Sequence, residues 1–287
     1  MHIVRLMLEF LPERFLFALQ KINMKYLYEI RMRAEQPTMA RYQDEYLYLT
    51  AYGLSEKKSE ALIAGKDEIE ETVLAAGKFS VYAVEEQLKQ GFITADCGER
   101  LGIAGHYVFE NGQPLSVRDY TSLCIRIPHE ILGCAEELYQ SCCKADMPNL
   151  LIVSPPGQGK TTILRDLTRI ISDRKKLNVL VCDERGEIGC LSVGERADVF
   201  RFADKRMAMS TGIRVMRPDV IVTDEIAGGD IPSLEIAKNS GVKIVATLHA
   251  GCLSEVEIEI QKIFDVIVVL DKIKIGKIVG VHQCKIS

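Results

Sequence analysis

A glycine-rich turn between an apolar strand and a helix is the feature that most constrains the fold of this chain. Residues 150–153 are Leu-Leu-Ile-Val, residues 154–162 are Ser-Pro-Pro-Gly-Gln-Gly-Lys-Thr-Thr, and helical spacing continues over 163–172. Glycines let backbone N–H groups turn inward around phosphate oxygens, and the dipole of the following helix favours the same anion. The strand–loop–helix order and the Gly-Lys-Thr sequence are those of a Walker A motif. The motif predicts a parallel α/β domain built around this segment.

The residues of the turn define a candidate ATP site. Lys160 has the length to reach the β- and γ-phosphates, and the hydroxyl of Thr161 is a candidate ligand of Mg²⁺. Ser154 stands where the motif usually begins with glycine; because it closes the strand, we expect it to contact no phosphate. The predicted phosphate-binding residues are Pro156, Gly157, Gln158, Gly159, Lys160, Thr161 and Thr162.

Two adjacent acids, Asp224 and Glu225, follow the apolar segment 220–222 in a Walker B arrangement. Asp224 is predicted to hold the water shell of Mg²⁺, and Glu225 is predicted to polarise the attacking water. Phosphoryl transfer depends on positioning and on charge stabilisation, and it needs both groups. A glutamate beside the metal-binding aspartate favours hydrolysis over transfer to a small acceptor.

Two further polar segments follow predicted strands. The turn 182–188, Cys-Asp-Glu-Arg-Gly-Glu-Ile, comes after 179–182, and His249 comes after 243–248. Ligands of open α/β sheets bind at the carboxyl ends of the strands. The acids of the turn are therefore candidates for a place near the γ-phosphate or a neighbouring subunit, with a solvated turn as the alternative. His249 is a candidate partner of the γ-phosphate or the attacking water, with a structural role as the alternative.

Arginines that stabilise transition-state charge often come from a neighbouring subunit. Most surface arginines have no such role, so the sequence offers only candidates. They are Arg118, Arg126, Arg201, Arg206, Arg214 and Arg217.

Composition excludes several other classes of protein. The 287 residues carry a net charge of −4, and the pI of about 5.8 argues against a protein that grips nucleic acid along its phosphates. No apolar run reaches the roughly 18–20 residues that span a bilayer, and the N-terminus lacks the pattern of a secretory signal. Nine cysteines without zinc spacing indicate a reducing cytosol and neither a disulfide framework nor a zinc site.

The pattern of apolar and polar residues changes near residues 128–149. This change predicts an α+β domain at 1–128 and an ATPase domain at 129–287. In the first domain, antiparallel pairing is expected around an Asn111-Gly112 hairpin turn. The expected helices are 11–19, 67–76 and 80–90, and the expected strands are 28–33, 92–94 and 101–109, with a further strand beginning near 117.

The second domain is expected to hold a doubly wound sheet. Its apolar runs are short, continuous and separated by helical spacing, which is typical of parallel strands buried on both faces. A helix is expected over 128–143. The expected parallel strands are 150–153, 179–182, 220–222 and 243–248, and a closing hairpin is expected from 266–270 and 277–281.

These segments carry a resemblance to a known family. The sequences at 155–162, 182–188, 216–226 and 246–251 resemble the ordered boxes of secretion-type AAA-like ATPases, in which the second is an acidic box and the fourth a histidine box. The N-terminal half narrows the match to the stage III sporulation protein AA family. That half contributes Leu11-Pro12, Glu-Ile-Arg-Met-Arg at 29–33, Gly-Phe-Ile-Thr at 91–94 and Gly-Glu-Arg-Leu-Gly-Ile-Ala-Gly at 98–105, although Cys97 stands where we would expect glycine.

The resemblance implies a RecA-like P-loop ATPase domain behind a smaller α+β domain. It implies a ring of identical subunits, a hexamer, at the base of the mother cell–forespore channel. It also implies membrane proteins of that channel as partners. It also implies a cytoplasmic location, with a peripheral place at the membrane as an option, and ATP and Mg²⁺ as ligands. By position, Lys160 and Thr161 bind phosphates and magnesium, Asp224 and Glu225 form Walker B, Glu184 is the acidic box and His249 the histidine box.

Three other functions stay open on the sequence. The chain could bind ATP as a scaffold for a membrane complex without hydrolysing it. A small-molecule phosphotransferase would need an acceptor pocket, and no lid insertion is evident. A nucleic-acid motor is disfavoured by the acidic pI and by the absence of tryptophan.

Overall fold

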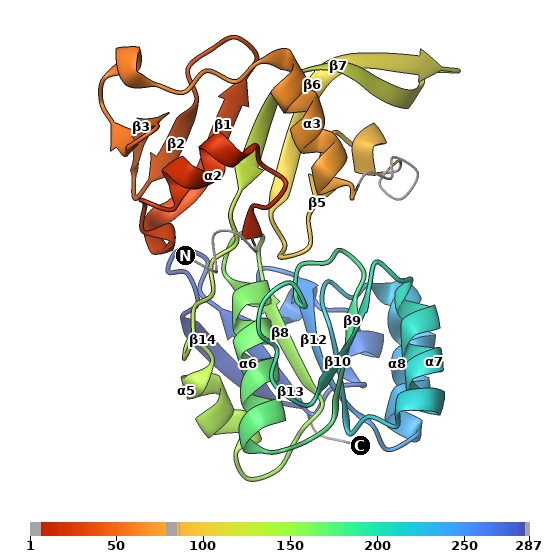
Figure 1. Cartoon of the computed structure of the whole chain (residues 1–287). Helices are drawn as coiled ribbons and strands as arrows, with labels where there is room; N and C mark the ends of the chain where they lie inside the picture. Colours follow the sequence, from red (N-terminus) through yellow and green to blue (C-terminus); the bar gives the residue numbers. More distant parts are fainter. Residues whose placement is uncertain (1–6, 79–84, 86, 285–287) are drawn as a thin grey trace. The chain divides into compact units, whose positions relative to one another are not determined.

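The computed structural model describes residues 7–78, 85 and 87–284. The chain divides into two compact units, Met1–His129 and Glu130–Ser287 (Figure 1). Each unit is built around its own seven-stranded sheet.

The first unit is an α+β domain with an antiparallel sheet in the order β4-β3-β2-β1-β7-β6-β5. Its helices α2 and α3 lie against one face of that sheet (Figure 1). The helical elements are α2 (Glu13–Leu19), η1 (Met24–Tyr26), η2 (Lys58–Glu60) and α3 (Lys66–Ala76). The strands are β1 (Leu27–Arg33), β2 (Met39–Tyr42), β3 (Glu45–Thr50), β4 (Gly53–Ser55), β5 (Phe92–Thr94), β6 (Arg100–Glu110) and β7 (Gln113–Arg126).

An apolar core explains these elements. Phe15 and Leu19 of α2 and Ile69 of α3 are fully buried against Ile30 of β1 and Ile125 of β7. The predicted strands 28–33, 92–94 and 101–109 and the helix 67–76 are confirmed within a residue or two, whereas the strand expected to begin near 117 begins at Gln113. The helix predicted over 11–19 begins at Glu13, because Pro12 has the extended backbone of an N-cap. Most of the helix predicted over 80–90 lies outside the described residues.

The second unit is a RecA-like α/β domain, with sheet order β10-β9-β11-β12-β8-β13-β14. The first six strands run parallel, and β14 pairs antiparallel with β13 as the predicted hairpin requires. The strands are β8 (Leu150–Ser154), β9 (Val179–Asp183), β10 (Ala197–Arg201), β11 (Val220–Thr223), β12 (Lys243–His249), β13 (Val266–Leu270) and β14 (Ile278–Gln283). The helical elements are α5 (Glu136–Leu138), η3 (Tyr139–Cys143), α6 (Lys160–Arg174), α7 (Lys205–Met216), η4 (Gly228–Asp230), α8 (Ile231–Asn239), η5 (Leu253–Glu255) and α9 (Ile258–Gln261).

Two apolar cores cover the two faces of this sheet. On β8, Leu150 and Ile152 belong to the core beneath α6, whereas Leu151 and Val153 belong to the core beneath α7 and α8. Successive strand residues point to opposite faces, so a strand buried on both faces must be continuously apolar. The apolar run at 150–153 is therefore the signature of a central strand.

The helix predicted over 128–143 is wrong in its first half. Regular structure begins only at Glu136, and Ile131 and Leu132 are exposed. Gly133 has a φ of +82°, which leaves the helical region, and the backbone N–H of Ala135 donates to the side chain of Asp166 at 2.9 Å. This contact belongs to the tertiary structure, and helical periodicity does not reveal it.

Candidate active site

The Walker A turn connects β8 to the first turn of α6. Gly157 and Gly159 have φ values of +77° and +83°, a left-handed region that glycine enters without steric cost. Gly159 is the N-cap of α6, so Lys160, Thr161 and Thr162 form the first helical turn. Their unpaired N–H groups and the helix dipole point toward the same place, which suits a phosphate group.

The ammonium group of Lys160 is held at the mouth of this turn. Its Nζ donates to the carbonyl oxygens of Ser154 at 2.7 Å and Pro155 at 3.0 Å, and it lies 2.9 Å from Nδ1 of His249. The residue is only 6% exposed. Burial lowers the pKa of Lys160, although the charge of Glu225 acts in the opposite direction. The ammonium therefore occupies a site that lacks a full counter-charge, and an anion would complete it.

Glu225 stands directly after β11 and the buried Asp224. Its backbone has a φ of +41°, and its N–H donates to Oγ1 of Thr247 on the neighbouring strand β12 at 2.9 Å. This bond fixes a backbone conformation that a non-glycine residue adopts at a cost. One carboxylate oxygen accepts from Nε2 of His249 at 2.9 Å, and the other forms an ion pair with Arg185.

His249 links the two catalytic candidates. Its two ring nitrogens face Lys160 on one side and Glu225 on the other. Although burial acts to raise the pKa of Glu225, the hydrogen bond from His249 and the charge of Arg185 hold that pKa below its ordinary value. Glu225 is therefore ionised near neutral pH, as a group that orients and polarises water must be.

Asp224 fits the role of a magnesium-binding acid. It is 2% exposed, and its Oδ2 atom is buried without a hydrogen-bond partner. Burial and the nearby Asp183 raise the pKa of Asp224 to about 7. A buried carboxylate oxygen without a donor is a costly arrangement that a bound cation relieves. Among the residues that the structure describes, no group of three or more His, Cys, Asp or Glu side chains could hold a metal by itself. A metal at Asp224 would therefore depend on Thr161, water and phosphate oxygens.

The acidic turn after β9 places a different glutamate at the site from the one expected. The buried carboxylate of Asp183 accepts the backbone N–H groups of Glu187, Ile188 and Gly189 at 2.8–3.0 Å, which folds the turn back on itself. As a result Glu187 lines the phosphate cleft. Glu184 is half-exposed and lies 3.7 Å from Nζ of Lys205.

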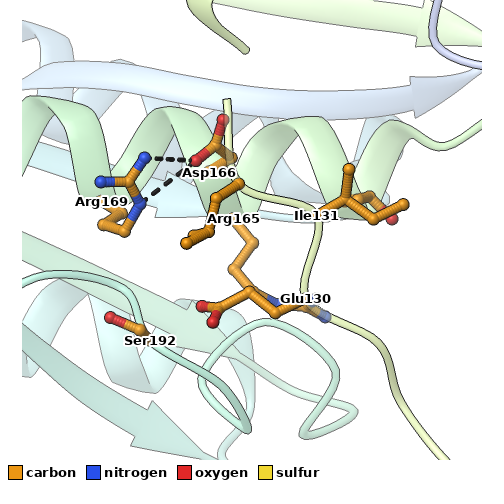
Figure 2. A pocket seen from close by; sticks show the side chains of 8 residues that line it. Glu130, Ile131, Arg165, Asp166, Arg169 and Ser192 are labelled. Atoms are coloured by element: carbon orange, nitrogen blue, oxygen red, sulfur yellow. Dashed lines mark hydrogen bonds and ion pairs between the residues drawn. The ribbon is translucent and has the colours of Figure 1, made fainter. Parts of the chain in front are cut away.

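Arg165 of α6 holds this turn in place. Its guanidinium donates to the carbonyl oxygens of Glu187 and Ile188, and the next residue, Asp166, binds Arg169 at 2.6 Å (Figure 2). The pocket beside these residues is narrow and includes Glu130, Ile131 and Ser192 (Figure 2). Because α6 also carries the phosphate-binding residues, Arg165 ties the position of Glu187 to that of the Walker A turn.

Most of the predicted residues line one cleft of about 390 Å³, whereas Gln158, Asp224 and Glu184 are not among its lining residues. Two basic residues that contact Glu225, Arg185 and Lys205, were not expected. Arg185 is outside the six candidate arginines, and Lys205 donates to the backbone carbonyl of Glu225 at 2.8 Å. The cleft is lined by Pro156, Gly157, Gly159, Lys160, Thr161, Thr162, Glu187, Glu225 and His249.

The domain that carries the Walker A turn, the two adjacent acids and the strand-end histidine has the fold of P-loop secretion ATPases of known structure. Solved structures agree on the fold. The Legionella pneumophila ATPase DotB has a TM-score of 0.56 and 14% identity, covering 88% of this chain and 74% of its own. The pilus retraction motor PilT with bound ADP has a TM-score of 0.62 and 14% identity, covering 91% and 80%.

Sequence comparison identifies the family. Residues 3–287 match the family described as Sporulation stage III, protein AA, and the chain belongs to that family. Stage III sporulation protein AA of Bacillus subtilis (strain 168) is 35% identical over 263 residues, which cover 86% of this chain and 82% of that protein. In the part of the chain that the structure describes, no helix is both long enough and apolar enough to cross a membrane.

Replacing Asp224 by asparagine is expected to stabilise the protein in the absence of Mg²⁺ and nucleotide. The folded-state pKa of about 7 lies above the ordinary value of 3.8. Between these values the folded carboxyl keeps a proton that the unfolded chain releases. The stability of the wild type therefore falls as the pH rises from about 4 and levels off above about 7.

Asparagine does not titrate, so its advantage over aspartate should grow with pH and reach on the order of 2–4 kcal/mol at about pH 8. Thermal unfolding of both proteins at about pH 5.5 and pH 8 measures this difference. An advantage of equal size at both pH values would contradict the assignment.

Proposed function

We propose that this chain is a Mg²⁺-dependent ATPase that assembles into a ring, with six subunits expected, and serves the channel between mother cell and forespore during sporulation. The linked set of Lys160, His249 and Glu225 beside the Walker A turn carries the proposal. Family membership and the secretion-ATPase fold support it. The proposed location is cytoplasmic, peripheral to the membrane, with membrane proteins of the channel as partners.

The chemistry follows from the positions of the side chains. The N–H groups at the start of α6 and Lys160 bind the phosphates, so Lys160 exchanges its carbonyl contacts for phosphate oxygens. Thr161 and Asp224 would hold Mg²⁺, which neutralises charge on the phosphates when bound. Glu225 orients and polarises the attacking water, and His249 couples its position to that of Lys160.

Exposed apolar side chains support self-assembly through the second unit. Met207, Val215 and Met216 of α7, Ile236 of α8 and Ile258 of α9 are each more than 40% exposed. Apolar surface of this kind often marks a protein–protein contact. A ring of subunits would cover part of it and place each ATP site near a neighbouring chain.

An ATP-gated scaffold without turnover is a second candidate. One observation favours it, because Arg185 and His249 each contact one carboxylate oxygen of Glu225. Glu225 can activate water only if one of these two contacts is broken. A motor would release Glu225 once ATP is bound. A scaffold would retain the contacts.

Hydrolysis and mass measured together test the proposal. The purified chain should release phosphate from ATP only with Mg²⁺, and its activity per subunit should rise with protein concentration as the mass by light scattering approaches that of a ring. Tight ATP binding by a ring without turnover would favour the scaffold. A monomer that binds no ATP would overturn both candidates.

A further inference from the structure

The turn between β13 and β14 exposes two large apolar side chains beside the Walker A segment. Residues 271–277 are Asp-Lys-Ile-Lys-Ile-Gly-Lys. Ile273 is 86% exposed and Ile275 is 73% exposed. Each isoleucine forgoes a stabilising burial, which makes the exposure of two of them in one short turn informative.

Hydrogen bonds within the turn hold its shape. The carboxylate of Asp271 accepts the backbone N–H groups of Ile273 at 2.7 Å and Lys274 at 3.1 Å. The N–H of Asp271 donates to the carbonyl of Lys277 at 2.8 Å, which closes the loop. Because these bonds already hold the turn, little further conformational entropy is lost when a ligand contacts it.

Direct contacts join this turn to the phosphate-binding residues. The N–H of Gly276 donates to the carbonyl oxygen of Gln158 at 3.1 Å. A side chain on Gly159 would place its Cβ 3.3 Å from Cγ2 of Ile275, so Ile275 lies against the residue that opens α6. Ile275 therefore borders the Walker A turn, and Ile273 lies two residues before it in the same exposed turn.

Strand order fixes the direction in which a bound nucleotide must lie. The catalytic candidate His249 ends β12 and Glu225 lies just after β11, and both strands lie on one side of the Walker A strand β8. The strand on the other side of β8 is β13, and residues 271–277 follow it. A nucleoside triphosphate with its γ-phosphate toward Glu225 directs its nucleoside toward β13.

We propose that Ile273 and Ile275 form the apolar wall against which the base of the nucleotide packs. The inference rests on the proposed ATPase function and extends it to the choice of base. Isoleucine contacts the flat face of a base without reading its donors and acceptors. The wall therefore favours the larger purines over pyrimidines and separates ATP from GTP only weakly.

Titration calorimetry on the full chain with Mg²⁺ tests this inference with ATP, GTP, CTP and inorganic tripolyphosphate as probes. The double variant Ile273→Ser/Ile275→Ser is expected to bind ATP and GTP about tenfold more weakly. Its affinity for tripolyphosphate should not change, and the preference for ATP over CTP should shrink. Ile63→Ser is the matched control, since Ile63 is 49% exposed and belongs to the first unit.

Three results would overturn the inference. The first is an ATP affinity that is unchanged in the double variant while Lys160→Ala abolishes ATP binding. That result would leave the proposed function intact. The second is an equal loss of ATP and tripolyphosphate, which would show that the turn only supports the Walker A segment. The third is ATP binding that survives Lys160→Ala, which would remove the proposed function as well.

Discussion

Replacing Glu225 by glutamine is expected to reduce ATP hydrolysis at least about a hundredfold while ATP affinity stays within about threefold. Glutamine has the same shape and still accepts a hydrogen bond from His249, but its neutral amide cannot polarise water or take a proton. The carboxylate lies beside the cleft with its pKa held low, so the loss of charge is the only large change. Phosphate release and calorimetric ATP binding on the same preparation measure the two effects.

The acidic turn supplies matched controls for this variant. Glu187→Gln changes an acid that lines the cleft, and Glu184→Gln changes the half-exposed acid that the family resemblance of the sequence implies as the acidic box. We expect Glu187→Gln to impair hydrolysis more than Glu184→Gln, whose influence would have to pass through Lys205. Glu225→Gln with the turnover of the wild type would refute the role of Glu225, and a loss confined to Glu184→Gln would assign that role to the acidic box.

Local sequence predicts the central elements of the fold. The strand at 150–153 is continuously apolar because both its faces are buried, and the glycines that follow have the left-handed backbone that the motif requires. The strand β10 was not predicted, since it lies at the sheet edge and only partly buries its polar sequence Ala-Asp-Val-Phe-Arg. Strands β2–β4 were missed as well, and β3 exposes its first two residues. Of these strands, β10 and β4 lie at sheet edges and pair with a single neighbour, so their sequences carry a weak pattern. Strands β2 and β3 lie inside the sheet, but they are short and only partly buried, so they lack a clear apolar alternation.

The residues of the candidate site likewise include some that the sequence predicts and some that it does not. Lys160, Glu225 and His249 each follow a recognisable strand, so their meeting at one edge of the sheet follows from parallel pairing. Glu187 and Arg185 depend on the shape of the turn 183–189, which the Asp183 carboxylate imposes through three backbone bonds. The sequence does contain a signal for this turn, because Asp183 comes directly after the apolar segment 179–182. An acid that is buried at the end of such a strand needs hydrogen-bond donors, and the nearest are the backbone N–H groups that follow it.

Replacing Lys160 by methionine is expected to weaken ATP binding about a hundredfold without lowering thermal stability in the absence of nucleotide. A charge-assisted bond to phosphate is worth roughly 1.5–3 kcal/mol, which sets the size of the loss. The effect on folding stability has the opposite sign from the effect on ATP binding. Burial lowers the pKa of Lys160, so the folded state disfavours the ammonium at every pH below the ordinary value of 10.5. Methionine fills similar space and has no charge to bury.

Differential scanning calorimetry and ATP titration on one preparation separate the two effects. Lys243→Met is the matched control, because Lys243 is a partly exposed lysine that pairs with Asp265 away from the cleft. It should leave ATP binding unchanged. If Lys160→Met lost ATP binding together with several degrees of Tm, the loss would reflect a damaged fold. If it lost binding at an equal or higher Tm, then Lys160 is a group that the folded chain holds at some cost in stability, and the bound phosphate is what offsets that cost.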